Sequence, residues 1–446
     1  MKNKNYNQLG FTLIEVLIGL FVLAVAVLTL YALFQMSLKA LWESKAKITA
    51  TQLANQKMEM AHNLPYAAVG VVGGIPNGVI PATENINRND INFTVNTSVV
   101  YIDDSFDGLQ GGVPDDILPI DYKRVRVEVV WSSTYGQKSL VYLSDISAKE
   151  IESVAGGGTL KILVLNASGQ PVPQAQVHIV NTAVNPIINL TMETNDNGLL
   201  ILPGSPAATN NYEITVTKND GGVQYSTDQT YAATTENPMP EKRHASVFEG
   251  QQTSISFAID ELATLNANVE NASGIGLAYV NFNLRGDKLI GHDEFGNPIY
   301  KYEETKTTDA NGRIHLTTME WDSYTFSLPA VGHYNIAETL PLQPFDLLPA
   351  STTDFNIILE PKDQFSVLVV AKDINGNPLG DVTVRLFDKN LTRDETATTT
   401  DAGQFFFTPW GNASTTIQAT KAGFENYEDF FDVNGYHIEN IIMVTP

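Results

Sequence analysis

The sequence contains no cysteine in 446 residues. That absence excludes a disulfide framework, a zinc site built on thiolates and a cysteine nucleophile. The folded parts of the chain must therefore be stabilised by hydrophobic cores or by bound metal ions.

Basic residues are also scarce. The chain has 27 Lys and Arg against 50 Asp and Glu, which gives a formal net charge of −23. Such a field repels the phosphates of nucleic acids, so the bulk charge predicts no nucleic-acid partner. The one compact basic group, Lys123, Arg124 and Arg126, is interpreted as a solvated strand face or as partners of nearby aspartates, with a DNA contact as the alternative.

Recognisable catalytic motifs are missing too. The chain has no G-x-S-x-G nucleophile turn and no glycine loop that would bind phosphates. Its seven histidines are scattered, and none forms an i, i+4 pair on a helix. We therefore expect a protein that is not an enzyme and that has no cofactor other than the calcium considered below.

The strongest positive feature is an apolar run near the N-terminus. Residues 11–38 contain a single charge, Glu15, and the run is long enough to cross a bilayer as a helix. A carboxylate inside such a helix costs about 2.5–3.5 kcal/mol on insertion scales, so it usually has a partner. No Lys, Arg or His lies within a helical turn of Glu15. The partner must come from elsewhere, and an α-amine created by cleavage at Gly10 would serve.

The segment GFTLIEVL, Gly10–Leu17, resembles the processing site of bacterial type IV prepilins and type II secretion pseudopilins. In that family a membrane peptidase cuts after the glycine and methylates the new N-terminal phenylalanine. The resemblance implies cleavage between Gly10 and Phe11, methylation of Phe11, and pairing of Glu15 with the amine of a neighbouring subunit. An uncleaved signal anchor is the alternative.

The leader predicts the orientation of the protein. Lys2 and Lys4 precede the apolar run, and positive charge flanking a span stays in the cytoplasm. We therefore expect a single-pass protein of the inner or cytoplasmic membrane with its C-terminus outside. The resemblance implies later transfer to a pilus or pseudopilus at the cell surface.

The helix is expected to continue well beyond the membrane. Pro65 disfavours helical geometry at Leu64, so the predicted helix covers 11–64. Its second half has an apolar face at spacings of three and four, formed by Trp42, Ala46, Ala50, Leu53, Ala54, Met58 and Ala61. Such a helix resembles the filament-forming element of pilins. Unlike many major pilins, it has no proline about twenty residues after the cleavage site.

Alternating segments predict an antiparallel meander packed on this helix. They are 91–101, 122–131 and 138–144, with turn residues between them. Together with KMEMAHNLPY, 57–66, this region resembles minor pilins. The Gly156-Gly157-Gly158 run that follows is interpreted as a flexible joint.

The rest of the chain repeats itself about every hundred residues. The repeats begin at 159–180, 265–286 and 365–386, and each continues into a Thr/Asp/Gly turn and a closing strand. Short strands with such turns predict small β-sandwiches. The pattern resembles the carboxypeptidase regulatory-like, or transthyretin-like, domain, which implies a structural or adhesive module rather than a catalyst.

Two weaker candidate sites remain. Asp103, Asp104 and Asp107 lie on a Gly-rich loop and could supply oxygen ligands for Ca²⁺, with a solvated acidic loop as the alternative. In the third repeat, Phe406, Trp410 and Tyr427 could form an exposed binding patch. The alternative for these aromatic residues is a place in the core.

The expected fold class is an α+β pilin module, with a long helix and a small antiparallel sheet, followed by all-β tandem sandwiches. The expected division is a leader peptide 1–10, a transmembrane and filament helix 11–64, a pilin sheet domain 65–155, and sandwiches 156–260, 261–361 and 362–446. The predicted function is a minor type IV pilin or pseudopilin that displays its β-domains for adhesion or interaction. Its expected partners are other pilin subunits, prepilin peptidase, the membrane and a surface ligand. The alternative is a membrane-anchored binding protein that never polymerises.

Overall fold

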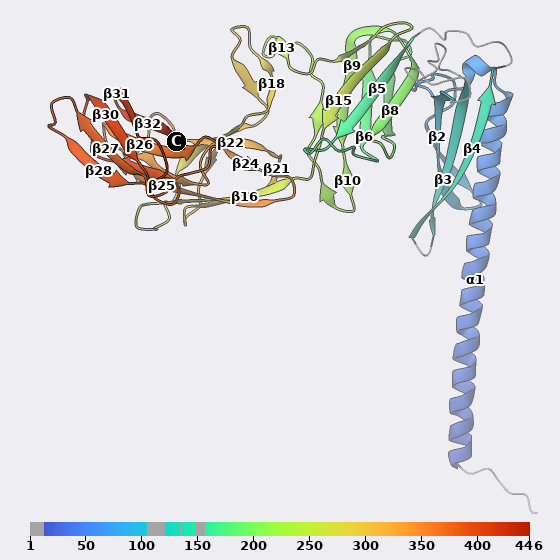
Figure 1. Cartoon of the computed structure of the whole chain (residues 1–446). Helices are drawn as coiled ribbons and strands as arrows, with labels where there is room; N and C mark the ends of the chain where they lie inside the picture. Colours follow the sequence, from blue (N-terminus) through green and yellow to red (C-terminus); the bar gives the residue numbers. More distant parts are fainter. Residues whose placement is uncertain (1–12, 105–120, 134–135, 149–156) are drawn as a thin grey trace, which may run out of the picture.

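The computed structural model describes residues 13–104, 121–133, 136–148 and 157–446. One long helix, α1, is followed by many small antiparallel and mixed β-sheets, so the chain is mostly β, as predicted. Figure 1 shows α1 as an isolated rod at its N-terminal end. The β-sheets begin beside its other end and extend sideways from it.

The helix α1 spans Leu13–Asn63, about 77 Å at 1.5 Å per residue. It ends two residues before Pro65, as the sequence predicts, and a short 3₁₀ turn follows at Tyr66–Ala68. Six of the seven residues predicted for its apolar face are buried. The exception is Trp42, which is 54% exposed, because it lies beyond the part of the helix that the sheet covers.

The first sheet packs on the second half of α1. It is an antiparallel meander in the order β1-β2-β3-β4, and together with α1 it forms the N-terminal module. Its strands are β1 Thr83–Arg88, β2 Ile91–Ile102, β3 Tyr122–Ser133 and β4 Gly136–Ser147. Alternation along β2 and β3 directs Phe93, Val95, Val125, Val127 and Val129 into a core shared with α1.

Three β-sandwiches follow. Sandwich 1 contains β5 Gly158–Leu165, β6 Gln176–Asn181, β7 Ile188–Glu193, β8 Leu199–Ser205, β9 Ala208–Thr217, β10 Asn219–Asp220, β11 Val223–Gln224, β12 Asp228–Gln229, β13 Met239–Pro240, β14 Ala245–Val247 and β15 Gln252–Ala258. Sandwich 2 contains β16 Ala263–Glu270, β17 Asn281–Gly286, β18 Leu289–His292, β19 Pro298–Tyr300, β20 Glu303–Thr307, β21 Arg313–Met319, β22 Asp322–Ser327, β23 Tyr334–Leu340, β24 Phe345–Leu347 and β25 Thr352–Pro361. Sandwich 3 contains β26 Ser366–Asp373, β27 Thr383–Asp388, β28 Asp394–Thr398, β29 Gln404–Phe407, β30 Ala413–Thr420, β31 Tyr427–Val433 and β32 Tyr436–Met443.

The three sandwiches share one topology. In each, the first strand lies between an antiparallel strand and the last strand, which pairs with it in parallel: β8-β5-β15, β21-β16-β25 and β29-β26-β32. The opposing sheet is built around the second strand, as β9-β6-β7, β20-β17-β22 and β28-β27-β30. The sequence repeat is therefore a repeat of three-dimensional structure.

The repeated Thr-x-x-x-Gly turn has a specific structural role. The threonines Thr194, Thr308 and Thr399 are buried, and each hydroxyl accepts a backbone N–H and donates to a backbone carbonyl of the loop between the first two strands. The glycines Gly198, Gly312 and Gly403 have φ values of +68°, +78° and +71°. A Cβ on any of them would overlap a carbonyl oxygen of the first strand. The turn thus fastens one sheet of each sandwich to the other.

Candidate functional site

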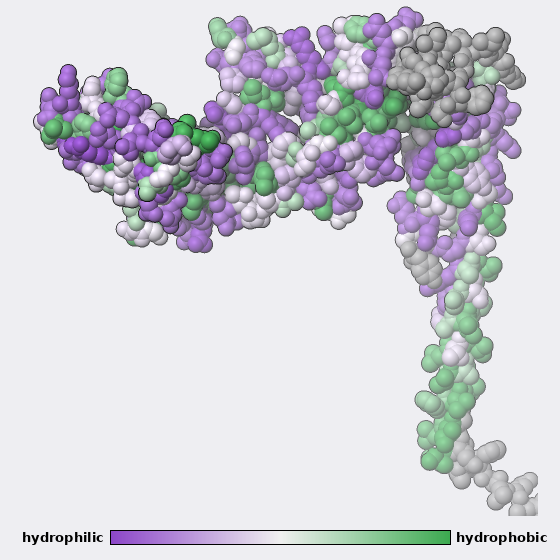
Figure 2. Space-filling model, in the orientation of Figure 1, coloured by the Kyte–Doolittle hydropathy of each residue, from purple (hydrophilic) through white to green (hydrophobic). Residues whose placement is uncertain are grey.

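The first half of α1 exposes almost all of its apolar side chains. The exposed large residues run from Leu13 to Trp42 and include Phe21, Leu28 and Phe34, each at least 61% accessible. By length and composition this helix can cross a membrane, with a mean hydropathy of 2.1 over its most apolar window. Figure 2 shows this apolar stretch below the more polar β-sheets. Glu15 lies on the same helix, within its first turn.

The second half of α1 is fastened to the sheet. Ala46, Ala50, Leu53 and Ala54 are at most 5% exposed and pack against the valines of β2 and β3. Small residues at these positions allow the helix to lie close to the sheet. The first half of the same helix is not covered by the sheet, so it is available for contacts with other molecules.

A buried lysine holds the turn that follows α1. Lys123 on β3 is 2% exposed, and its Nζ donates to the carbonyls of Tyr66 at 2.8 Å and Val69 at 2.7 Å. The same ammonium lies over the rings of Tyr66 and Tyr101. Burial lowers the pKa of Lys123 to about 8. The solvated strand face predicted from the sequence is wrong for Lys123, because its side chain points into the module.

The other two basic residues of that group pair with acidic residues. Arg124 donates two hydrogen bonds to Asp145, at 2.7 and 2.8 Å, and these bonds hold the pKa of Asp145 below its usual value. Arg126 pairs with Glu128 at 3.1 Å. Pairing with an aspartate, predicted from the sequence, is confirmed for Arg124, whereas the partner of Arg126 is a glutamate.

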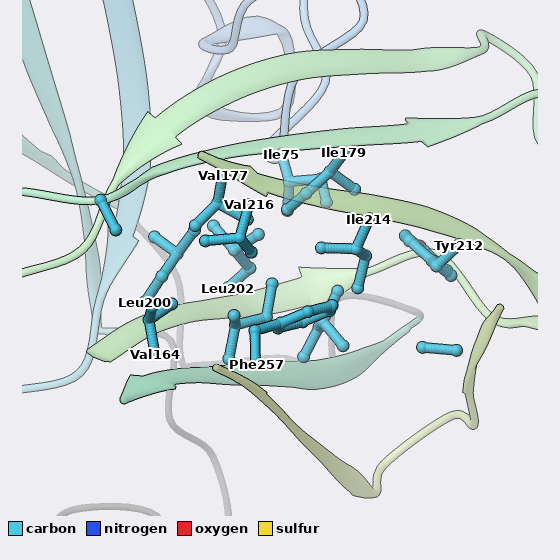
Figure 3. Packing of buried hydrophobic residues seen from close by; sticks show 14 of the residues in the cluster. Ile75, Val164, Val177, Ile179, Leu200, Leu202, Tyr212, Ile214, Val216 and Phe257 are labelled. Atoms are coloured by element: carbon cyan, nitrogen blue, oxygen red, sulfur yellow. The ribbon is translucent and has the colours of Figure 1, made fainter. Parts of the chain in front are cut away.

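The N-terminal module is docked on sandwich 1 through side chains. Ile75, from the segment between α1 and β1, is 3% exposed and belongs to the core of sandwich 1, where Figure 3 shows it beside Ile179. The ring of Tyr101 packs on the same core and lies so close to Gly204 that a Cβ on this glycine would overlap the ring. The Asn189 N–H also donates to the Gly73 carbonyl, at 3.0 Å.

The glycine run between the two parts is not the flexible joint predicted from the sequence. Gly156 lies outside the described residues, but Gly157 and Gly158 are buried, and Gly158 begins β5. A Cβ on Gly158 would overlap the carbonyl oxygens of Phe248 and Gln251. These two glycines permit close packing of backbone on backbone.

Sandwiches 1 and 2 are joined by a small sheet. The segment around His292 forms the hairpin β18–β19, and β18 pairs with β13 of sandwich 1. Across the same joint, Lys301 Nζ donates to the Thr227 carbonyl at 2.6 Å. Glu320 holds that lysine at 2.7 Å, which fixes its direction.

Sandwiches 2 and 3 share part of a core. Leu368 and Val370 of β26 are at most 6% exposed and belong to the core cluster of sandwich 2. The buried amide of Gln404 donates to the Thr339 carbonyl at 2.6 Å and accepts the Thr339 N–H at 3.1 Å. Tyr436 Oη donates to the Ile336 carbonyl at 2.9 Å. Every joint along the β region is thus made by specific contacts.

The predicted acidic site is only partly described. Asp103 and Asp104 follow the end of β2, and the Asp104 N–H donates to the Asp121 carboxylate. Asp107 lies outside the described residues. Among the residues that are described, no group of three or more His, Asp or Glu side chains could hold a metal ion. The calcium site remains a prediction.

The predicted aromatic patch is not assembled. Trp410 is 3% exposed, packs on Phe407 in the core of sandwich 3 and donates its indole N–H to Thr415 at 2.9 Å. Phe406 faces the opposite way and packs at the joint with sandwich 2, near Tyr436. Tyr427 lies at the rim of the core. The core interpretation is correct for Trp410, because its indole packs among the buried residues of the sandwich.

Comparison with known proteins bears on the N-terminus. A family model for the prokaryotic N-terminal methylation motif matches residues 5–31. No curated protein matches the chain. The N-terminus therefore carries a type IV prepilin-like methylation motif, and it is followed by β-sandwich domains.

Several solved structures are similar to the chain at low identity. The Bacillus anthracis TIE protein is 13% identical, with 82% of this chain and 73% of that chain covered and a TM-score of 0.19. A streptococcal ancillary pilin is 12% identical, with 65% and 99% covered and a TM-score of 0.17. The minor pilin of Streptococcus agalactiae is 10% identical, with 41% and 96% covered and a TM-score of 0.18. At such TM-scores the whole chains do not superpose, and we draw no functional conclusion from them.

Proposed function

We propose that this protein is a minor type IV pilin or pseudopilin. The observation that carries the proposal is the methylation motif at 5–31, which runs into a helix whose apolar residues are exposed. A helix of this kind needs lipid before assembly and neighbouring helices after it. Prepilin peptidase and other pilin subunits are the partners that follow.

In this proposal, cleavage falls between Gly10 and Phe11, and Phe11 becomes the methylated N-terminus. The carboxylate of Glu15 pairs with the amine of a neighbouring subunit. That pair would offset the cost of a charge inside the membrane or the filament core. The mature protein passes from the inner or cytoplasmic membrane to a filament at the cell surface.

The three sandwiches act as a displayed arm. We assign them to the carboxypeptidase regulatory-like class and place their boundaries near 156–260, 261–361 and 362–446. Packed helices lie about 8–10 Å apart, whereas a hundred-residue domain has a radius of gyration of about 13 Å. The contacts at the joints argue against the sandwiches folding back on one another. An arm on every subunit would therefore interfere with the side-by-side packing of subunits in a filament. A position at the tip, or at low abundance, relieves that crowding.

Mass spectrometry of the mature protein tests the processing step. We expect an N-terminal N-methylphenylalanine at position 11, and Gly10→Leu should retain the leader because the bulky side chain blocks cleavage. Gln8→Leu, also in the leader, is the matched control and should be processed. Normal processing of the Gly10 variant would refute the assignment. A C-terminal tag that is absent from isolated filaments would favour the membrane-anchored protein that does not polymerise.

A further inference from the structure

One sheet face of sandwich 2 carries a row of polar side chains. Asn266 and Asn268 point outward from β16, between buried neighbours that point into the core. The parallel strand β25 places Asp354 and Asn356 directly beside them, and β21 places His315 on the other side of Asn266. The row therefore crosses three adjacent strands.

These side chains form two hydrogen-bonded groups, one of His315, Asn266 and Asp354 and the other of Asn268 and Asn356. The Asn266 amide donates to Asp354 at 2.8 Å, and the Asn268 amide donates to Asn356 at 2.9 Å. His315 Nδ1 lies 2.6 Å from the Asn266 oxygen. Since that oxygen can only accept, Nδ1 carries the proton, and a neutral His315 keeps Nε2 as an acceptor. These hydrogen bonds fix the direction of each polar group in advance.

An open hollow of about 660 Å³ is lined by four members of the row: Asn266, Asn268, His315 and Asp354. Thr307, Asp309 and Arg313 line it as well, with Ile314 as an apolar part of the wall. Small-molecule sites are typically about 300–1,000 Å³ and use a few fixed polar groups for orientation. The volume and the lining both suit a small ligand.

The fold itself does not require these polar residues. At the register positions of His315, Asn266 and Asp354, sandwich 3 has Phe406, Leu368 and Ile438. Sandwich 1 has Ile201, Lys161 and Ser254 at the same positions. The shared topology therefore tolerates apolar or mixed side chains there. The hydrogen-bonded polar row belongs to sandwich 2 alone among the three.

The charges of the hollow indicate the class of ligand. Two carboxylates, Asp309 and Asp354, oppose one guanidinium, Arg313, within a chain whose net charge is −23. An anion is therefore repelled by the surroundings, and Arg313 offsets one of the two carboxylates, so the lining offers a cation little net attraction. The lining offers hydrogen-bond donors and acceptors side by side, which matches hydroxyl groups, since each of them donates and accepts.

We propose that this hollow binds a neutral saccharide through its hydroxyl groups. Asp354, His315 Nε2 and the Thr307 oxygen accept from the sugar, while Arg313 donates to it; the Thr307 hydroxyl itself donates to Asn281 at 2.6 Å. The proposal supplies a ligand class for the displayed arm and so rests on the function proposed above. Its test needs only the purified chain, whereas processing and filament incorporation test the pilin assignment separately.

The test uses the full chain in lipid nanodiscs, because maltoside detergents would present sugars to the site. Saturation-transfer NMR and calorimetry would probe N-acetylglucosamine oligomers, maltotriose and lactose, with inorganic phosphate and sialyllactose as anionic probes. We expect at least one neutral sugar to bind. Asn266→Leu and Asp354→Ile, which introduce the residues of sandwich 3, should each weaken that binding at least about tenfold. Asp354→Ile removes a hydrogen bond to the sugar, and Asn266→Leu removes the amide that orients Asp354 and His315.

Ser254→Ala in sandwich 1, at the register position of Asp354, is the matched control and should leave binding unchanged. Asp354→Asn keeps the shape of the side chain, so it should weaken binding even if the apolar variants fold poorly. Failure of every neutral sugar to bind would overturn the proposal. Preference for phosphate, or equal binding by the variants, would overturn it as well.

Discussion

The two halves of α1 differ in what surrounds them. Between Leu13 and Trp42 the large apolar side chains are exposed, whereas Leu53 and the alanines from Ala46 to Ala61 form one wall of a core. Both halves belong to the same continuous helix. The difference lies in the sequence: the first half is apolar on every side, and the second half keeps its apolar residues on one face.

This contrast shows which part of the chain buries its own apolar side chains and which part leaves them exposed. Burying one large apolar side chain contributes about 1.5–3 kcal/mol, so the exposed half of α1 cannot remain in water. The β region, by comparison, is closed by its own cores and joints. Assembly should therefore depend on the first half of α1, and stability of the N-terminal module on the second.

The largest expected effect concerns Glu15, in the first half. Glu15→Leu should leave membrane insertion at least as efficient, since a charge is removed from the span. Incorporation into filaments should be almost lost, because the amine of the neighbouring subunit has no carboxylate to pair with. Immunoblots of membrane and sheared-filament fractions would measure both. Ser37→Leu, a polar-to-apolar change in the same helix, is the control and should assemble normally; equal assembly of the Glu15 variant would show that the glutamate has no partner between subunits.

A smaller effect should appear in the second half. Leu53 is 1% exposed, and Leu53→Ala should lower the free energy of unfolding of the N-terminal module by about 2–5 kcal/mol, since it leaves a cavity. Leu23 is 59% exposed, and Leu23→Ala should change that free energy by less than about 0.5 kcal/mol. Urea unfolding in nanodiscs, followed by tryptophan fluorescence, would compare them. Equal losses would mean that the two halves are not separate in function.

Local patterns in the sequence predicted the elements of this fold well. The alternation in β2, β3 and β4, the end of α1 before Pro65 and the three repeats all appear in the structure. Strand β1 was missed, because the sequence TENINR has no apolar alternation and the strand depends on pairing with β2. The local sequence therefore determines these elements, except for β1, which depends on pairing with a neighbouring strand.

The contacts between domains could not be predicted in the same way. Ile75 and Gln404 are buried by segments far away in sequence, so no spacing rule identifies them, and the same holds for Lys123 within the N-terminal module. The hollow of sandwich 2 was missed for the same reason: Asn266 and Asp354 are 88 positions apart and meet only through the parallel pairing of β16 with β25. An unusual number of asparagines in a first strand was the one available signal.

The smallest expected effect concerns Lys123, whose buried ammonium holds the turn after α1. Burial lowers the pKa of Lys123 from its ordinary 10.5 to about 8, so between these pH values the unfolded chain binds more protons than the folded one. Stability should therefore rise with pH above 8, by at most about 1.4 kcal/mol per pH unit. Burial raises the pKa of Tyr66 to about 12, and this acts in the opposite direction above pH 10, where an unfolded tyrosine ionises first. Between pH 8 and 10 Tyr66 therefore does not contribute. Burial also lowers the pKa of Lys288 in sandwich 2, so the unfolding to be followed is that of the N-terminal module alone. Urea unfolding across this pH range should show the rise in the natural chain and in Lys138→Met, which changes an exposed lysine of β4, but not in Lys123→Met. A rise that persists in Lys123→Met would assign it to another group and leave the buried ammonium without a measurable effect.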